Sequence, residues 1–244
     1  MNSTNDQNIP NYISQPELKR EYNEKLFGRI AAKYDLLNRI LSFGSDGKWK
    51  RAAVSMLPNE GVNSCLDVAC GTGDLTVLLA EKYTQAKICG LDLTAKMLDI
   101  AKKKVGNKKN EFVIGDMCDM PFGDNCFDVV TAFYAIRNAP DLERALDEII
   151  RVTRPGGCIC LLDFSKPVNK FMQAIELAAL KLWCGLCGRV FYRGSNPYSY
   201  IVPSLRAFPD SKQLKEILQQ HGYILKQSHN QAFGMIKILI CEKC

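Results

Sequence analysis

The stretch Asp67-Val-Ala-Cys-Gly71-Thr-Gly73-Asp74 decides the fold class of this chain. It follows the short apolar run 64–69 and precedes the helix-like run 75–83. Glycines in such a place permit a sharp turn and let the backbone approach a ligand closely. The stretch therefore predicts a strand, a tight turn and a helix that begins beside a binding site.

The alternation of strand and helix continues on the C-terminal side of that turn. Short apolar runs separated by helical runs of about 10–15 residues are typical of βαβ units and a parallel sheet. The expected strands are 64–69, 87–93, 111–116, 126–136 and 156–164, with two closing strands at 223–231 and 232–243. The expected helices of this part are 75–83, 94–105, 139–153 and 210–222, the last capped by Asp210 or Ser211.

The length of 244 residues suits one domain with a small cap or lid. We expect residues 1–20 to form a flexible arm and residues 21–244 to form a single domain. The expected parts of that domain are a helical lid (21–60), a cofactor-binding core (64–166), an insertion that faces substrate or membrane (167–209), and a closing helix with strands (210–244). Within the insertion, the pattern predicts a long apolar helix at 169–192 and irregular structure at 194–205.

Composition excludes several classes of protein. Apolar residues make up 47% and charged residues 24% of the chain, which is close to globular averages and argues against fibrous or disordered chains. The net charge of +6 is too small and too dispersed to predict a nucleic-acid partner. Many of the eleven cysteines lie inside apolar runs, where thiols act as small hydrophobes, and this favours a reduced, cytosolic compartment. We expect neither a secretory leader nor a membrane-spanning segment.

The glycine-rich turn favours a cofactor without phosphates. A dinucleotide fingerprint would need a third glycine where Thr76 stands. Asp74 opens the following helix and would repel a pyrophosphate there, whereas Asp67 and Asp74 would attract an ammonium or sulfonium group. S-adenosylmethionine carries both groups. The alternative is a generic glycine turn followed by a helix cap.

Acidic residues end the next two strands as well. Asp92 lies about twenty residues after the glycines, where a carboxylate accepts hydrogen bonds from ribose hydroxyls. Asp116 could accept the adenine amino group, with Met117 against the ring. Either acid alone could be a loop cap, but together they mark the edge where an α/β sheet binds ligands. The expected cofactor-binding residues are Asp67, Gly71, Thr72, Gly73, Asp92, Leu93, Asp116, Met117 and Phe133.

These motifs, with Pro121–Asp128 and Arg154–Gly157, resemble the class I S-adenosylmethionine-dependent methyltransferases. Two longer blocks, Tyr34–Trp49 and Arg151–Pro167, resemble the signatures of the ubiquinone/menaquinone biosynthesis C-methyltransferase family. The resemblance runs from about Phe27 to the C-terminus. The chain departs from the family pattern at Leu37 (usually Met), Asp46 (usually His) and Asp163 (often Glu). Asp163 and the segment 198–209 look closer to the naphthoquinone branch, demethylmenaquinone or demethylphylloquinone.

The resemblance implies a seven-stranded, mostly parallel sheet with helices on both faces, an antiparallel last strand and an N-terminal helical lid. It also implies S-adenosylmethionine-dependent C-methylation of a prenylated quinol, most simply demethylmenaquinol. Alternatives are a ubiquinone-precursor benzoquinol, another small phenol or amine, and a non-enzymatic nucleoside-binding scaffold.

Three residues are the expected catalytic group. Tyr34 lies on a helix that could cover the cofactor and exclude water; the alternative is a helix packed on the sheet edge. Arg137 and Asn138 follow the long fourth strand, and Arg137 could stabilise a developing phenolate or orient a water. The alternative for Arg137 is a salt bridge to a local acid such as Asp141.

The remaining expectations concern partners. The lysines at 102–104, 108 and 109 could attract an anionic membrane, although a solvated helix end is the commoner reason for such a run. The apolar stretch 171–191 could contact lipid or a prenyl tail, or it could be core. No metal is expected, because the CxxC pairs at 184/187 and 241/244 lie far apart and do not resemble a zinc ribbon. Peripheral membrane association and a homodimer both stay open.

Overall fold

Seven strands of the described chain form one sheet. The structure is a computed structural model that describes residue 12 and residues 15–106, 110–191 and 197–244. The strand order is β3-β2-β1-β4-β5-β7-β6, and β7 runs antiparallel to both of its neighbours while the first five strands are parallel. The strands are β1 (Ser64–Val68), β2 (Lys87–Asp92), β3 (Glu111–Ile114), β4 (Phe127–Phe133), β5 (Thr153–Phe164), β6 (Tyr223–Gln231) and β7 (Ile236–Lys243). The predicted fold class is confirmed.

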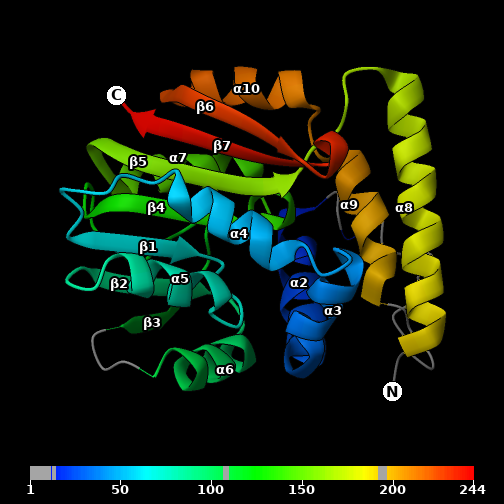
Figure 1. The fold of residues 1–244 in the computed structure, drawn as a ribbon, viewed down its shortest axis with the longest axis horizontal. Coiled ribbons are helices and arrows are strands. Elements are labelled where there is room, and N and C mark those ends of the chain that lie inside the picture. Colours follow the sequence, from blue (N-terminus) through cyan, green and yellow to red (C-terminus); the bar gives the residue numbers. More distant parts are fainter. Residues whose placement is uncertain (1–11, 13–14, 107–109, 192–196) are drawn as a thin grey trace.

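Helices cover both faces of this sheet (Figure 1). Those that the structure describes are α2 (Pro16–Ile30), α3 (Tyr34–Leu41), α4 (Asp46–Ser55), α5 (Asp74–Lys82), α6 (Ala95–Val105), α7 (Leu142–Val152), α8 (Lys170–Phe191), α9 (Ile201–Ala207) and α10 (Ser211–Gln220). Helices α4 and α5 bury apolar side chains against one face, and α7 and α10 do so against the other. Short 3₁₀ turns occur at 31–33, 136–138, 197–200 and 232–234.

A third group of helices lies beyond the carboxyl ends of the parallel strands. Figure 1 shows α2, α3, α8 and α9 gathered there. Their shared apolar cluster is separate from the two clusters of the sheet. Because the sheet core is complete without them, these helices form a cap over the edge where an α/β sheet binds ligands.

Local signals set most element boundaries. Asp141 accepts a hydrogen bond from the backbone nitrogen of Arg144 (3.2 Å) and starts α7. Asp210 and Gln213 form a reciprocal capping box at the start of α10. Gly73 has a left-handed backbone (φ 82°) directly before α5, as the glycine-rich turn requires.

Several boundaries differ from those expected from the sequence, including those of α2, β5 and α9. Helix α2 begins at Pro16, so residues 16–20 belong to the cap; residues 1–11 and 13–14 lie outside the described chain. Strand β5 begins at Thr153 and therefore includes the glycines at 156 and 157. Its pairing with β4 shifts register between Phe127 and Val129. Residues 201–207 form helix α9 because tertiary contacts bury Val202 and Leu205.

The cysteines are free thiols, and most are buried. Burial raises the pKa of Cys65 to about 12, so this thiol stays protonated at physiological pH. Within the described residues no group of three or more His, Cys, Asp or Glu is arranged to hold a metal ion. Helix α8 is long and apolar enough to cross a membrane by length and composition, whereas the sequence predicted no membrane-spanning segment.

Two glycine substitutions test the packing of the fold in opposite directions. A Cβ on Gly157 would lie 2.7 Å from the carbonyl oxygen of Arg154 and 2.7 Å from Cγ2 of Thr153. The backbone there must shift, so we expect Gly157→Ala to lower the free energy of unfolding by about 1–3 kcal/mol. Gly185 in α8 has no neighbour within 4 Å of such a Cβ, and we expect Gly185→Ala to raise that free energy by about 0.5–1 kcal/mol. Urea denaturation measures both; an unchanged stability of Gly157→Ala would contradict the tight packing at β5.

Candidate active site

Two adjoining pockets open at the carboxyl ends of the parallel strands. The smaller has a volume of about 70 Å³ and lies over β1, β2 and β4; the larger, of about 370 Å³, lies between the sheet and the cap. Both are lined by Phe27, Tyr34, Tyr134 and Asn138, so these four residues form the boundary between them. A ligand in one pocket can therefore touch a ligand in the other.

The smaller pocket collects six of the nine residues expected to bind the cofactor. They are Gly71, Asp92, Leu93, Asp116, Met117 and Phe133. Gly71 has a left-handed backbone (φ 55°), and a Cβ there would lie 3.6 Å from the Tyr34 ring. Glycine at this position keeps the turn open beneath the cap.

Asp92 is anchored so that its carboxylate faces the pocket. Its Oδ2 accepts a hydrogen bond from the backbone nitrogen of Gly71 (2.8 Å), and its Oδ1 accepts one from that of Thr94 (2.8 Å). Burial raises the pKa of this carboxyl, while the two backbone donors lower it. The Thr94 side chain also hydrogen-bonds to this carboxylate, but an ionised carboxylate has about four acceptor positions, so Asp92 can accept a further hydrogen bond from a ligand hydroxyl.

Asp67 and Asp74 have different roles from those expected. Asp67 is buried behind the turn, where it accepts hydrogen bonds from Thr76 (2.7 Å) and Thr131 (3.3 Å). Burial raises its pKa to about 7. Asp74 forms ion pairs with Lys50 (3.2 Å) and Lys104 (2.5 Å), which lower its pKa against the opposing effect of burial. Neither carboxylate lines either pocket, so neither is placed to attract the cofactor directly.

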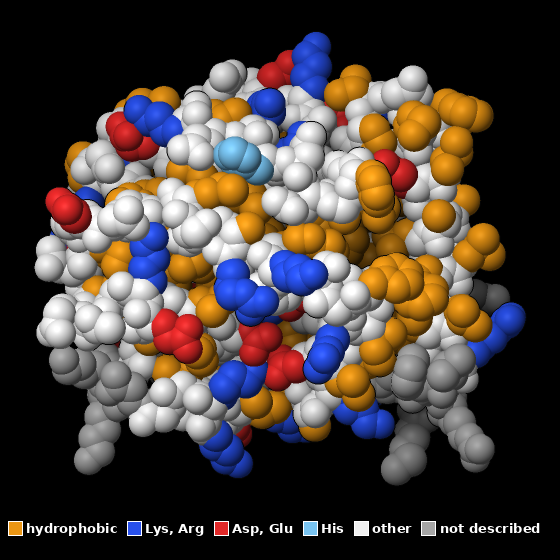
Figure 2. Space-filling model, viewed as in Figure 1, with side chains coloured by type: hydrophobic (Ala, Val, Ile, Leu, Met, Phe, Trp, Pro, Cys, Tyr) orange, Lys and Arg blue, Asp and Glu red, His pale blue; other side chains and the backbone are white. Residues whose placement is uncertain are grey.

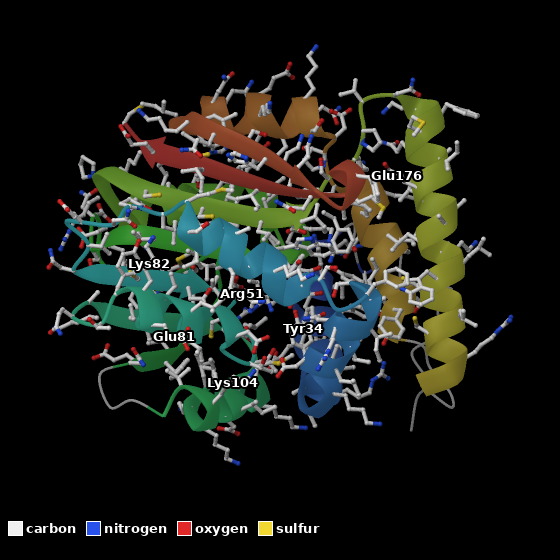
Figure 3. All side chains as sticks on the ribbon, in the orientation of Figure 1. Tyr34, Arg51, Glu81, Lys82, Lys104 and Glu176 are labelled. Carbon is white, nitrogen blue, oxygen red and sulfur yellow. The ribbon has the colours of Figure 1, made fainter. Side chains whose placement is uncertain are left out.

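Thr72 and Gly73 join the turn to its surroundings. The Thr72 hydroxyl donates to Asp35 of α3 (2.5 Å), and Lys104 of α6 pairs with the same carboxylate (2.7 Å). Figure 3 shows Tyr34 on α3 and Lys104 on α6. A Cβ on Gly73 would come within 3.0 Å of Ala101, so this glycine is needed where α6 packs on the turn. Neither Thr72 nor Gly73 lines a pocket.

Helix α2 closes the smaller pocket from outside. Arg20 pairs with Asp116 (3.0 Å), and Asn23 donates to the backbone oxygen of Asn138 (2.7 Å). Helix α2, which precedes the helix carrying Tyr34, therefore lies over the site. Pockets for small molecules usually measure about 300–1,000 Å³, so the smaller pocket must widen before a nucleoside enters. The contacts of α2 and α3 are the ones that must loosen.

The donor and acceptor set suits S-adenosylmethionine. Its ribose and adenine groups need acceptors, which Asp92 and Asp116 supply. Asn138 adds another, because its Oδ1 is buried and has no hydrogen-bond partner among the described residues. The carboxylates would also favour a cationic ligand over a pyrophosphate. The residues present therefore fit this cofactor.

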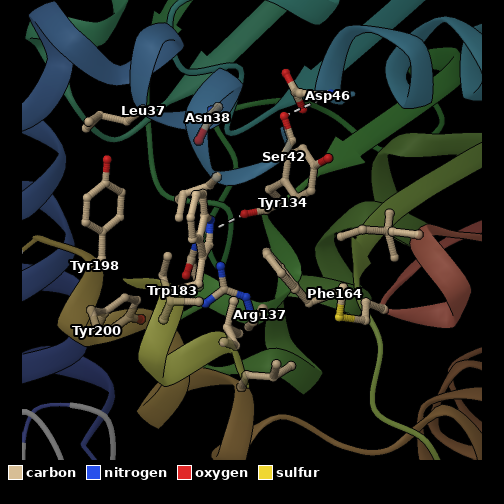
Figure 4. A pocket seen from close by; sticks show the side chains of 18 of the residues that line it. Leu37, Asn38, Ser42, Asp46, Tyr134, Arg137, Phe164, Trp183, Tyr198 and Tyr200 are labelled. Carbon is tan, nitrogen blue, oxygen red and sulfur yellow. Dashed lines mark hydrogen bonds between the residues drawn. The ribbon is translucent and has the colours of Figure 1, made fainter. Parts of the chain in front are cut away.

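Arg137 lines the larger pocket and is held in place by a buried acid. Its Nε lies 3.5 Å from Oδ1 of Asp163, and its backbone nitrogen donates to Oδ2 of the same residue (3.1 Å). Its Nη1 donates to the Ser204 hydroxyl of α9, and its guanidinium lies 5.1 Å from the centre of the Phe164 ring. The expected alternative, a salt bridge to an acid such as Asp141, is present with a different partner, Asp163 on β5. Arg137 therefore pairs with Asp163 and also lines the larger pocket (Figure 4).

Asp46 and Tyr134 are site residues that the sequence analysis did not select. Both line the larger pocket, and Figure 4 shows them with Ser42. The Tyr134 hydroxyl is hydrogen-bonded to Asp46. The pKa of Tyr134 lies well above its usual value, mainly because the hydroxyl is buried and secondly because the Asp46 carboxylate is close. Lys50 pairs with Asp46 at 2.7 Å. The departure from histidine at position 46 was the one signal in the sequence that could have identified this group.

Backbone strain marks Tyr134 as well. Its φ of 55° lies in the left-handed region, which aromatic residues seldom adopt. This conformation follows the end of β4 and turns the side chain toward both pockets. Such strain is often retained where a side chain must reach a site.

The rest of the larger pocket is mainly apolar. Its walls come from α2, α3, α8, α9 and the turn before β7, and Trp183, Tyr198 and Tyr200 contribute aromatic surface. Glu176 is the second carboxylate in the lining, and burial raises its pKa. Figure 3 shows Glu176 on the side of α8 nearest the sheet.

Removing the Asp92 carboxylate tests the cofactor position. Each charge-assisted hydrogen bond to a ribose hydroxyl contributes about 1.5–3 kcal/mol, so we expect Asp92→Ala to weaken S-adenosylmethionine binding by about tenfold or more. Calorimetric titration measures the dissociation constant, and thermal unfolding confirms that the variant is folded. Asp99→Ala, at an exposed position on α6, is the matched control. An unchanged dissociation constant in folded Asp92→Ala would remove Asp92 from the cofactor site.

Comparisons with known proteins agree with this geometry. A profile of the ubiE/COQ5 methyltransferase family matches residues 15–243. The demethylmenaquinone methyltransferase of Thermotoga maritima is 38% identical over 205 residues, which cover 84% of this chain and 89% of that protein. The protein of the same name from Symbiobacterium thermophilum is 35% identical over 238 residues, or 93% and 95% of the two chains.

Solved structures support the fold at lower identity. A SAM-dependent methyltransferase from Aquifex aeolicus superposes with a TM-score of 0.58 at 14% identity, covering 85% of this chain and 98% of that one. Phosphoethanolamine N-methyltransferase 2 of Haemonchus contortus, in complex with S-adenosyl-L-methionine, gives a TM-score of 0.60 at 15% identity, covering 80% and 52%. With the family match over nearly the whole chain, this chain belongs to the ubiE/COQ5 methyltransferase family and is an S-adenosylmethionine-dependent methyltransferase.

Proposed function

We propose that this enzyme methylates a ring carbon of a prenylated naphthoquinol, converting demethylmenaquinol to menaquinol. The continuity of the two pockets carries the proposal: a large apolar chamber meets the cofactor pocket at Tyr34, Tyr134 and Asn138. The relatives described above are named demethylmenaquinone methyltransferases, and the chain covers most of their length.

The shape and lining of the larger pocket suit a flat ring with an apolar tail. Tyr134 and Phe164 form one aromatic wall, with their ring centres 6.1 Å apart. Trp183 of α8 also lines the chamber, among apolar residues of the cap. A prenyl tail can extend along this apolar wall while the ring stays beside the cofactor.

The reaction needs the acceptor in its reduced form. When bound, the cofactor supplies an electrophilic methyl group on its sulfonium, which passes to the ring carbon beside an ionised hydroxyl while the sulfur keeps the electron pair. The ring carbon then loses its own proton, and the aromatic quinol is restored with one proton released overall. A quinone ring is electron-poor and lacks the hydroxyl whose ionisation drives this step.

Arg137 is the group placed to stabilise the ionised hydroxyl. Arginine stays cationic at any working pH, and Asp163 with Ser204 holds its guanidinium at the pocket wall. A fixed positive charge in a dry pocket acts most strongly where negative charge develops. Asn138 lies beside it at the boundary of the two pockets and can orient either ligand.

Asp46 is the group placed to accept the hydroxyl proton. Only Asp46 and Glu176 contribute carboxylates to the described lining of the larger pocket. Tyr134 links Asp46 to the boundary with the cofactor pocket, whereas Glu176 lies on α8 and does not line that pocket. The proton can pass to Asp46 directly or through the Tyr134 hydroxyl.

The substrate assignment is tested with labelled S-adenosylmethionine and a short-tailed demethylnaphthoquinone, with and without dithionite. We expect methyl transfer to the reduced acceptor only. A benzoquinol with the same tail is the competing acceptor, and faster transfer to it would move the assignment to ubiquinone precursors. Equal rates with oxidised and reduced naphthoquinone would contradict the quinol mechanism.

Substitution of Arg137 tests its part in the chemistry. We expect Arg137→Gln to lower kcat by about 10²-fold with a smaller change in KM, because the lost interaction is strongest in the transition state. Arg137→Lys keeps the charge and should recover part of kcat. If a folded Arg137→Gln enzyme keeps full kcat, Arg137 has no part in the chemistry and only its structural pairing with Asp163 stands.

Substitution of Asp46 tests the proton acceptor. We expect Asp46→Asn to lower kcat by about 10²–10⁴-fold, the usual range for a general base, and to make the remaining rate rise with pH as hydroxide replaces the carboxylate. Single-turnover rates across pH measure this effect. Glu176→Gln is the comparison; a larger loss there than in Asp46→Asn would place the base on α8.

A further inference from the structure

The outer face of α8 is an exposed apolar stripe. Phe171, Ile175, Ala178, Leu182 and Leu186 follow one another at spacings of three or four residues, which places them on one side of the helix. All five are exposed, with Leu182 at 77% and Phe171 at 73%. Figure 2 shows apolar side chains along the side of the molecule where Figure 1 places α8. Soluble chains rarely expose such a continuous patch without a partner.

Two phenylalanines extend the apolar surface around the larger pocket. Phe43 and Phe233 are highly exposed, and both have a left-handed backbone, with φ of 50° and 57°. Phe43 stacks on Trp183 of the pocket wall with ring centres 4.5 Å apart. Phe233 lies between Ala232 and Met235, which line the same pocket. A left-handed backbone at an aromatic residue is a strained conformation of a kind that often occurs at functional sites.

The charges on α8 are arranged for an anionic surface. Lys170, Lys181 and Arg189 are exposed on the helix. Its one acidic residue, Glu176, lines the pocket rather than the outer face. An apolar stripe with flanking cations is typical of a helix that lies in the headgroup region of a membrane with anionic lipids.

The inner face of α8 is packed into the cap, which argues against a membrane-spanning orientation. Cys184 and Cys187 are buried in the cap cluster with residues of α2 and α3, and Trp183 packs against that cluster. A spanning orientation would separate these side chains from α3 and α9 and expose the cap. The packed helix offers lipid only its outer stripe.

We propose that the outer stripe of α8, with Phe43 and Phe233, docks on an anionic lipid bilayer so that the larger pocket opens toward the lipid. This inference rests on the proposed function, because a prenylated quinol dissolves in the bilayer and must enter the pocket from there. The stripe and the two phenylalanines border the pocket that receives it. The cations attract the surface, and the apolar side chains hold the protein on it.

Vesicle flotation without substrate tests the docking surface. We expect the wild-type enzyme to bind vesicles of phosphatidylcholine with about 30% phosphatidylglycerol and to bind pure phosphatidylcholine more weakly. Leu182→Glu with Leu186→Glu should lower the partition coefficient by about tenfold or more. Phe233→Asn should also lower it, and asparagine tolerates the left-handed backbone. Lys181→Gln with Arg189→Gln should remove the preference for anionic lipid.

The matched control replaces exposed apolar residues elsewhere on the surface. Ile114 and Ile224 are 60% and 40% exposed on β3 and β6, away from α8, so Ile114→Glu with Ile224→Glu should bind vesicles like the wild type. Wild-type protein that stays unbound on anionic vesicles, or a Leu182/Leu186 variant that binds normally, would overturn the proposal. So would sedimentation showing a dimer that the Leu182/Leu186 variant alone disrupts, without vesicle binding.

A soluble assay separates this inference from the proposed function. Leu182, Leu186 and Phe233 do not line either pocket, so their variants should keep wild-type activity on a short-tailed acceptor without vesicles. Activity of the wild type in that assay with no vesicle binding would overturn the docking surface alone. No activity on any reduced quinol, with vesicle binding intact, would overturn the proposed function and leave the surface in place.

Discussion

The arrangement of the larger pocket depends on a buried ion pair between Arg137 and Asp163 at the edge of the sheet. Arg137 follows β4 and Asp163 lies in β5, so the pair joins two neighbouring strands beside the larger pocket. A buried charge without a partner costs several kcal/mol, and this requirement fixes the guanidinium in one direction. Burial raises the pKa of Asp163, and the arginine opposes that change. Because the pair is fixed, Ser204 of α9 and the lid can be placed against it.

Helix α2 is hydrogen-bonded to two backbone oxygens beside this ion pair. Lys19 donates to the oxygen of Arg137 (3.2 Å), and Asn23 donates to that of Asn138 (2.7 Å). Burial and, to a lesser extent, the nearby Arg137 charge lower the pKa of Lys19 to about 8. The other lid contacts, such as Arg20 with Asp116, are partly exposed ion pairs of small energy. These polar contacts hold α2 beside the smaller pocket.

The enzyme thus separates two tasks. Acids and a glycine turn line the smaller pocket at the sheet edge, while the cap forms an apolar chamber that suits the proposed acceptor. Tyr34 and Tyr134 stand between the two pockets, where the proposed methyl transfer would take place. The cap has its own apolar cluster, so its outer surface is free to meet a lipid phase without loosening the sheet.

The sequence predicted the sheet and its ligand-binding edge because these depend on local signals. Strand period, glycine turns and helix caps such as Asp210 are readable along the chain, and they placed all seven strands and Asp92. Patterns did not predict α9, whose helix depends on the burial of Val202 and Leu205 by the cap.

The sequence by itself determined that acids and glycines meet at the carboxyl ends of β1, β2 and β3, since parallel strands bring those ends together. Only the tertiary structure decided which acids face the ligand. Asp67 turns to Thr76 and Thr131, Asp74 to two lysines, and Asp46 joins Tyr134 in the pocket. The reason is physical: where a buried carboxylate points depends on the donors that neighbouring elements bring to it, and those donors lie far away in the chain.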